Sequence, residues 1–148
     1  MRAYIGIDPG KSGAAALIHE DGELILDWPG DVALAADHVR QWKFEFNIQL
    51  AALEKVTARP GQGVVSMFSF GQNLGSWQGI LSALSIPFLM PTPQAWQKGL
   101  VDRKSGDDPK SCSLATARRL FPDVDLNLKK HHGRADALLL AYWAKQNL

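Results

Sequence analysis

The pattern of apolar and polar residues predicts that the chain opens with three short strands. Apolar runs at residues 3–7, 14–19 and 23–28 are separated by turn residues. Asp21 and Gly22, between the last two runs, are a strong signal for a tight hairpin turn. We therefore expect an antiparallel meander at the start of the fold.

The rest of the chain alternates stretches of helical spacing with short apolar runs, which predict strands at residues 48–53 and 87–90. Helices are predicted from the Asp31 cap to about residue 46, then at 66–84, around Trp96, at 109–120 and at 135–146. Polar loops are expected at residues 98–108 and 127–133, and the first of these is the best candidate for a mobile loop. A hairpin followed by strand–helix crossovers indicates an α/β fold, with helices on both faces of a mixed sheet.

Length and composition restrict the class of protein. The 148 residues, 46% of them hydrophobic, suit a single domain over residues 1–148. The lone Cys112 excludes an internal disulfide and a cysteine-rich zinc site, and it suits a reducing cytoplasm. We expect no signal peptide and no membrane segment, because the longest apolar stretch, at residues 135–144, is short and contains Asp136.

Charge is distributed unevenly, although the net charge is only +1. The segment from Lys98 to Arg134 holds nine Lys and Arg residues against five Asp residues. A phosphate-binding face would be locally basic in this way. An ordinary solvated helix surface has the same pattern, and charge by itself favours that second interpretation.

Two carboxylates stand where predicted strands end. Asp8 follows the first strand and Glu54 follows the fourth. In open α/β sheets the carboxyl ends of strands face the crevice where ligands bind, so the two acids converge if their strands are neighbours. Converging carboxylates repel each other unless a cation neutralises them, and hard divalent cations prefer oxygen ligands. The alternatives are that Asp8 only begins a turn and that Glu54 is a surface acid.

A third acid, Asp136, lies in the first turn of the most apolar predicted helix. A lone buried charge needs a partner. His132 precedes it by four residues and shares its face if the helix begins early, whereas His131 would face elsewhere. The alternatives are an acid favoured by the helix dipole and a histidine exposed on a loop.

The chain resembles the RuvC family of Holliday junction resolvases, within the ribonuclease H-like superfamily, and in particular its phage and prophage branch. The residues that carry the resemblance are Ile5 to Gly10 with Gly13, Leu53 to Val56, Gly71 to Gly75, and Ala135 to Leu140. The resemblance implies a mixed five-stranded sheet flanked by helices on both faces. It also implies a homodimer that cuts four-way DNA junctions by paired nicks, in recombination, repair or phage DNA processing.

The resemblance also implies the site residues. Asp8, Glu54 and Asp136 match the acids with which the family holds two divalent ions, Mg²⁺ or Mn²⁺. The family's fourth ligand is an Asp or His one turn before the last acid. Three residues before Asp136 stands Gly133, which has no side chain to offer, so we assign this role to His132 with a shifted spacing. His131, or neither histidine, stays an alternative.

Substrate contacts follow from the same resemblance. Lys98 and Lys110 match lysines that hold DNA phosphates in the family, and the alternative is that both are ordinary surface lysines. Arg134 could also offset phosphate charge. The family carries an aromatic residue shortly after its middle Glu, whereas the first aromatic residues after Glu54 are Phe68 and Phe70. Either of these could replace it or pack in the core.

Other functions are compatible with parts of the pattern. One alternative is a nuclease with broader substrate specificity, which would also cut flaps and forks. Another is a non-catalytic junction-binding protein, which would be expected to lack one of the acids. An ATP-binding fold related to sugar kinases can also open with Gly-x-Asp, but it needs a longer, two-lobed chain. The helix containing Trp77 and the spaced glycines Gly71, Gly75 and Gly79 is our expectation for a dimer contact, with core packing as the alternative.

Overall fold

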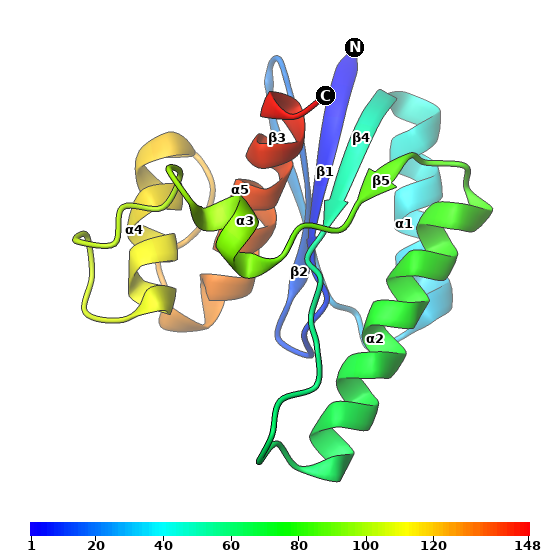
Figure 1. Ribbon diagram of the computed structural model, residues 1–148. Helices are drawn as coiled ribbons and strands as arrows, with labels where there is room; N and C mark the ends of the chain where they lie inside the picture. Colours follow the sequence, from blue (N-terminus) through cyan, green and yellow to red (C-terminus); the bar gives the residue numbers. More distant parts are fainter.

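The computed structural model describes residues 1–148, and its centre is a five-stranded mixed sheet in the order β3-β2-β1-β4-β5 (Figure 1). Strand β1 pairs antiparallel with β2 and parallel with β4, and β4 pairs parallel with β5. The strands are β1 Arg2–Asp8, β2 Ala14–His19, β3 Gly22–Asp27, β4 Asn47–Leu53 and β5 Phe88–Leu89. The predicted opening meander and mixed sheet are confirmed.

Helices cover both faces of this sheet, as predicted. Figure 1 shows α1 and α2 on one side of the strands and α4 and α5 on the other. Each side has its own hydrophobic core, one built with α1 and α2 and the other with α4 and α5. The helices are α1 Val32–Glu45, α2 Val64–Ala83, α3 Pro93–Gln97, α4 Pro109–Leu120, the 3₁₀ turn η1 Lys129–His131, and α5 His132–Gln146. None of them is long and apolar enough to cross a bilayer.

Helix α5 lies directly on β1, and this contact positions the site. Gly6 in β1 permits it, because a Cβ at that position would overlap the backbone of Ala137 and Ala141. Alternate residues of β1, such as Ile5 and Ile7, pack into the core on the opposite face of the sheet. The backbones of β1 and α5 therefore approach closely, and a side chain at the start of α5 can reach the end of β1.

Helix α5 begins at His132, three residues earlier than we predicted, and the expected loop at residues 127–133 is partly helical. The reason is tertiary. Gly133 lies against the backbone of Ser12 and Gly13, where any Cβ would overlap the carbonyl oxygen of Ser12. The first turn of α5 thus packs against the loop after β1. This contact makes the helix begin at His132, before the apolar pattern that starts at Ala135.

We predict that Gly133→Ala destabilises the chain by about 2 kcal/mol, because a methyl group forced into a packed contact shifts the backbone. Gly71→Ala is the matched control. Gly71 also lies within a helix, but nothing lies within 4 Å of its missing Cβ, so alanine there should stabilise the chain by about 0.5–1 kcal/mol. Urea unfolding measures both changes, and equal stability of Gly133→Ala and the wild type would contradict the packing role.

The structure assigns Trp77 to the alternative of core packing and leaves a dimer contact on the rest of the second helix as a prediction. Trp77 is fully buried in the core beside α1, so it cannot form a dimer contact. Gly71, Gly75 and Gly79 have no atom within 4 Å of a built Cβ, so no other part of this chain approaches α2 closely there. Phe68 is 67% exposed, which excludes a place in the core.

Candidate active site

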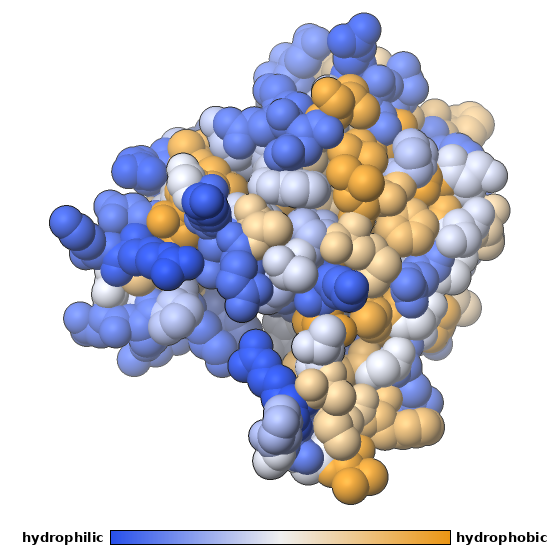
Figure 2. Space-filling model, viewed as in Figure 1, coloured by the Kyte–Doolittle hydropathy of each residue, from blue (hydrophilic) through white to orange (hydrophobic).

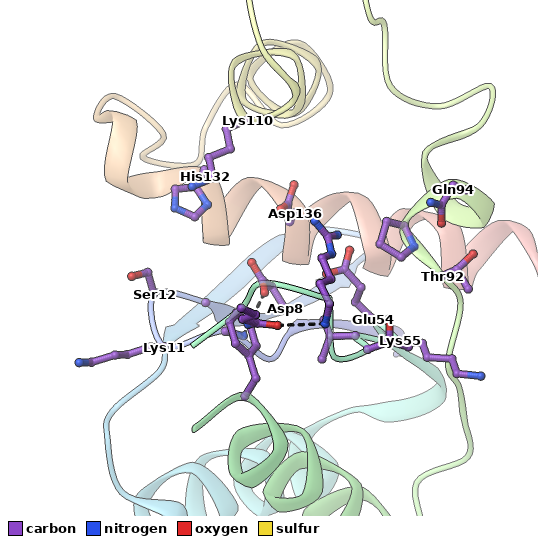
Figure 3. A pocket seen from close by; sticks show the side chains of 18 of the residues that line it. Asp8, Lys11, Ser12, Glu54, Lys55, Thr92, Gln94, Lys110, His132 and Asp136 are labelled. Carbon is purple, nitrogen blue, oxygen red and sulfur yellow. Dashed lines mark hydrogen bonds between the residues drawn. The ribbon is translucent and has the colours of Figure 1, made fainter. Parts of the chain in front are cut away.

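The ends of two neighbouring parallel strands bring Asp8 and Glu54 together. Asp8 is the last residue of β1, and Glu54 directly follows β4. The backbone N–H of Glu54 donates to the carbonyl of Ile7 at 3.1 Å, so the ladder between the strands continues as far as the acids. Both side chains line the same pocket, in which Figure 3 shows them with Asp136. The convergence expected from the strand ends is therefore present.

Helix α5 adds two further side chains to these acids. Asp8, His132 and Asp136 each offer one ligand atom, and these atoms all lie within 4.8 Å of one another. His132 and Asp136 stand four residues apart in α5, which places them on one face of the helix. Two carboxylate oxygens and an imidazole nitrogen are suitable ligands for Mg²⁺ or Mn²⁺, although Mg²⁺ favours oxygen more strongly.

The Oδ1 atom of Asp136 provides a test of whether a cation fits. This atom is buried and has no hydrogen-bond partner in the protein. An unpaired carboxylate oxygen in a buried place is unfavourable unless something outside the protein chain satisfies it. A divalent cation would do so, because it would sit among the three ligand atoms. The residues present therefore fit a metal ion.

His131 lies elsewhere, as the spacing indicated. Its ring is buried, its Nδ1 accepts a hydrogen bond from the backbone N–H of Leu128 at 3.2 Å, and the same atom lies 3.8 Å from Asp125. It does not line the pocket with the acids. Of the two candidate histidines, only His132 lies in position to be a ligand.

Glu54 stands slightly apart from the close cluster. It lines the pocket but is not among the three residues whose ligand atoms lie within 4.8 Å of one another. Its Oε2 atom accepts a hydrogen bond of 2.7 Å from the indole Nε1–H of Trp96. Burial, together with the nearby charge of Asp8, raises the pKa of Glu54 to about 7. Glu54 therefore lies close enough to Asp8 to feel its charge, while a hydrogen bond from Trp96 in α3 fixes one of its carboxylate oxygens.

Burial and mutual repulsion determine the charge of the site. The pKa of Asp8 is raised by burial, an effect that the N–H of Gly10 opposes by donating to Oδ1 at 3.1 Å. The pKa of Asp136 is raised well above its usual value by burial and then by the charges of Asp8 and Glu54. The pKa of His132 is lowered by burial and by Lys110. Without a cation the site therefore disfavours three negative charges, and its histidine favours the neutral form that can bind metal.

Basic and polar side chains surround the acids. The wall of the pocket is mostly polar, and Figure 3 shows Lys11 and Lys55 on opposite sides of the carboxylates, directed away from them. Arg59 and Phe70 also line it. No sequence pattern marks Lys11, Lys55 or Arg59 as site residues, and the one available signal is that Lys11 and Lys55 lie close to Asp8 and Glu54 in the chain.

The three predicted DNA contacts have different surroundings. Lys110, near the start of α4, lines the pocket beside His132. Lys98 follows α3, is exposed, and lies outside the pocket. Arg134 is only 22% exposed and donates two hydrogen bonds of 2.8 Å to Asp27 at the end of β3. The guanidinium of Arg134 thus joins α5 to the sheet edge, and a role in DNA binding stays a prediction.

Comparisons with known proteins support the fold. No protein-family model matches the chain. The chain is 39% identical over 87 residues to the chloroplastic Holliday junction resolvase MOC1 of Chlamydomonas reinhardtii, a match that covers 57% of this chain and 10% of that protein. The chain therefore spans only a small part of this relative.

Solved structures with the same fold match almost the whole chain. T. thermophilus RuvC in complex with a Holliday junction substrate has a TM-score of 0.64 at 17% identity, covering 97% of this chain and 92% of that one. A further Thermus thermophilus RuvC structure has a TM-score of 0.59 at 18% identity, covering 95% and 92%. The chain has the RuvC fold, so the predicted ribonuclease H-like architecture is confirmed.

Proposed function

We propose that the chain is a divalent-metal-dependent endonuclease that resolves four-way DNA junctions by paired nicks. The observation that carries this proposal is the cluster of Asp8, His132 and Asp136 with its unpartnered buried Oδ1 atom, in a fold shared with RuvC. The partial identity to a named Holliday junction resolvase supports the choice of substrate. Recombination, repair or phage DNA processing are the contexts in which such junctions arise.

The proposed reaction is hydrolysis of a phosphodiester with two ions, Mg²⁺ or Mn²⁺, in each active site. Asp8 would contact both ions, Glu54 and Asp136 would each hold one, and His132 would complete the set of ligands. When bound, the ions supply an activated water and stabilise the charge that develops on the leaving oxygen. Because burial and the charge of Lys110 lower the pKa of His132, its neutral imidazole is favoured, and this form would ligate a cation or exchange a proton with the reacting groups.

The rim of the pocket suits a DNA backbone. Arg59 and Lys110 line the pocket with the acids, and Lys11 and Lys55 extend outward from its two sides, so positive charge is available where DNA phosphates approach the negatively charged residues. Phe70 lines the same pocket and could stack on a base in place of the aromatic residue that the loop after Glu54 lacks. Lys98 and Arg134 would contact more distant phosphates, Arg134 only by releasing Asp27.

We predict that Lys110→Gln weakens junction binding and lowers the slope of log affinity against log salt by about 1, because one phosphate contact is lost. Lys145→Gln is the control, since Lys145 is exposed in the last turn of α5 and lies outside the pocket. Binding titrations in Ca²⁺ at several salt concentrations measure both slopes. Identical slopes for Lys110→Gln and the wild type would remove Lys110 from the DNA path.

Paired nicks require two active sites, so the proposal includes a homodimer. The start of α2 is the surface that suits a second copy. Val64 and Val65 are 79% and 80% exposed, and Phe68 follows them on the same helix. Figure 2 shows hydrophobic atoms at the lower end of the molecule, where α2 begins in Figure 1. Exposed apolar residues grouped in this way are typical of interaction surfaces.

A panel of labelled DNAs tests the proposal and its alternative, a nuclease for flaps and forks. We expect the four-way junction to be cut at two symmetric positions within one binding event, and duplex, flap and fork to be cut far more slowly. Equal rates on all branched forms would establish the alternative. Binding of the junction without cleavage in Mg²⁺ or Mn²⁺ would point to a non-catalytic binding protein. Single, uncoordinated nicks would contradict the dimer.

The cellular setting belongs to the proposal as well. We propose that residues 1–148 form a single nuclease domain that acts in the cytoplasm of a bacterial cell, encoded by the cell, a prophage or a phage. Cys112 is free and buried, which agrees with a reducing compartment. Fractionation of the producing cell tests this localisation.

A further inference from the structure

Two tryptophans of the chain are fully buried, and their indole N–H groups have different environments. Trp77, in α2, lies in the core that α1 and α2 form on one side of the sheet, and its Nε1 has no hydrogen-bond partner. Trp96 lies in the core on the other side of the sheet, and its Nε1–H donates to Oε2 of Glu54 at 2.7 Å. The two residues are alike in burial and differ in whether they touch the acids.

The backbone around Trp96 is held so that this contact forms. The parallel ladder of β4 and β5 extends beyond β5, since the N–H of Lys55 donates to the carbonyl of Pro91 at 2.8 Å. The hydroxyl of Thr92 then caps α3 by accepting from the N–H of Ala95, and Pro93 occupies the first turn. The register of the ladder thus places Trp96 within hydrogen-bond distance of Glu54. The cap and the proline keep the start of this short helix rigid.

The indole N–H is suited to holding a carboxylate in one orientation. It can only donate, so it pairs with the ionised group without competing for protons. A hydrogen bond to a charged partner in a buried place is among the stronger ones. Because Trp96 occupies Oε2, the Oε1 atom of Glu54 is left free. The backbone N–H of Glu54 is fixed to Ile7 at the same time, so the residue is held at both ends.

We propose that Trp96 is a positioning residue that orients Glu54 and keeps its Oε1 atom available to a divalent cation in the site formed with Asp8. This inference rests on the proposed metal-dependent function and assigns a role to a residue beyond the ligand set. Partners that orient metal ligands typically change metal affinity by about 10- to 100-fold when they are lost. The expected effect therefore falls on metal binding, with the maximal rate changed less.

The test compares Trp96→Phe with Trp77→Phe. In each position a second variant carries β-(3-benzothienyl)alanine, in which sulfur replaces the N–H with almost no change in shape. Mn²⁺ binding is measured without DNA by electron paramagnetic resonance, and the half-saturating Mn²⁺ concentration is then measured for junction cleavage. Both changes at position 96 should raise the half-saturating Mn²⁺ concentration about tenfold, and excess Mn²⁺ should recover most of the rate.

If a phenylalanine variant fails to fold, the sulfur analogues still test the role of the indole N–H, because they remove that donor with almost no change in shape. The sulfur analogue at position 77 should bind Mn²⁺ like the wild type, because the Nε1–H of Trp77 donates to nothing. Normal Mn²⁺ affinity with the sulfur analogue at position 96, or equal losses at positions 96 and 77, would overturn the positioning role. A wild-type chain that neither binds Mn²⁺ nor cuts a junction would instead overturn the proposed function itself.

Discussion

Asp8→Asn is expected to reduce the rate of junction cleavage by about a thousandfold or more while the chain stays folded. Asp8 is the residue that links both parts of the site, since it lies in the close cluster with His132 and Asp136 and also interacts with Glu54. Asparagine keeps the size and one acceptor oxygen, so the N–H of Gly10 retains a partner. What is lost is the charge that would hold the ions, and metal ions contribute several kcal/mol to such transition states, at about 1.4 kcal/mol per tenfold in rate.

Single-turnover cleavage of a labelled four-way junction at saturating Mg²⁺ or Mn²⁺ measures this loss. Asp37→Asn is the matched control, because Asp37 is an exposed acid of α1 that pairs with Arg40 at 2.7 Å and does not line the pocket. The control should cut at the wild-type rate. An Asp8→Asn variant within tenfold of the wild type would show that the reaction does not depend on this cluster.

The second large expected effect is an increase in stability rather than a loss of activity. Asp136→Asn should stabilise the metal-free chain at pH 8 by about 2 kcal/mol, although it too should abolish cleavage. The pKa of Asp136 is raised well above its usual value by burial and by Asp8 and Glu54, so the ionised form is unfavourable in the folded state. A hydrogen bond from Ser113 and the charge of Lys110 offset only part of this penalty, and replacing the buried charge with a neutral group of the same shape removes it. For a chain of this length the gain corresponds to about 4–8 °C in Tm.

The raised pKa values of the acids make the stability of the metal-free chain depend on pH. A carboxyl whose pKa is raised by folding binds more protons in the folded state than in the unfolded state, so stability falls as pH rises between the two pKa values. For Glu54 this window runs from the ordinary 4.5 to about 7. The raised pKa values of Asp8 and Asp136 act in the same direction. The wild type without metal should therefore lose stability over this range, and the advantage of Asp136→Asn should grow across it.

Urea unfolding in EDTA at pH 4 and pH 8 measures the stabilisation. The variant should match the wild type at pH 4 and exceed it at pH 8. Mn²⁺ should then stabilise the wild type strongly and the variant little, because a ligand that binds only the folded state shifts the unfolding equilibrium. A variant less stable than the wild type at pH 8 would mean that the carboxylate of Asp136 is compensated by the protein rather than by a cation.

Much of the fold could be predicted because local signals agree with the tertiary structure. The limits of α4, from Pro109 to Leu120, follow from a proline at the first helical position and the Phe121-Pro122 pair. Asp31 caps α1 as expected, accepting from the N–H of Ala33 at 2.8 Å. The early start of α5 depends instead on Gly133 meeting the loop after β1, a contact between distant segments that no local pattern reports.

The site residues that could be predicted from the sequence are ionisable side chains at or near the end of a predicted strand or helix. Asp8 and Glu54 stand out because apolar strands end on them, and His132 because it lies one turn before Asp136. The contact of Trp96 with Glu54 joins residues 42 positions apart through the register of a two-residue strand. The pairing of Arg134 with Asp27 spans 107 positions. Contacts of this kind follow from tertiary packing, so periodicity does not reveal them.

A supercoiled plasmid that extrudes a cruciform tests the central claim most directly. Coordinated nicks in both strands convert it to linear DNA, whereas independent nicks leave an open circle. We predict linear product in Mg²⁺ or Mn²⁺, none in EDTA, and none with Asp8→Asn in any metal. Plasmid that stays supercoiled in every divalent metal, although the folded chain binds the cruciform, would contradict the proposed resolvase.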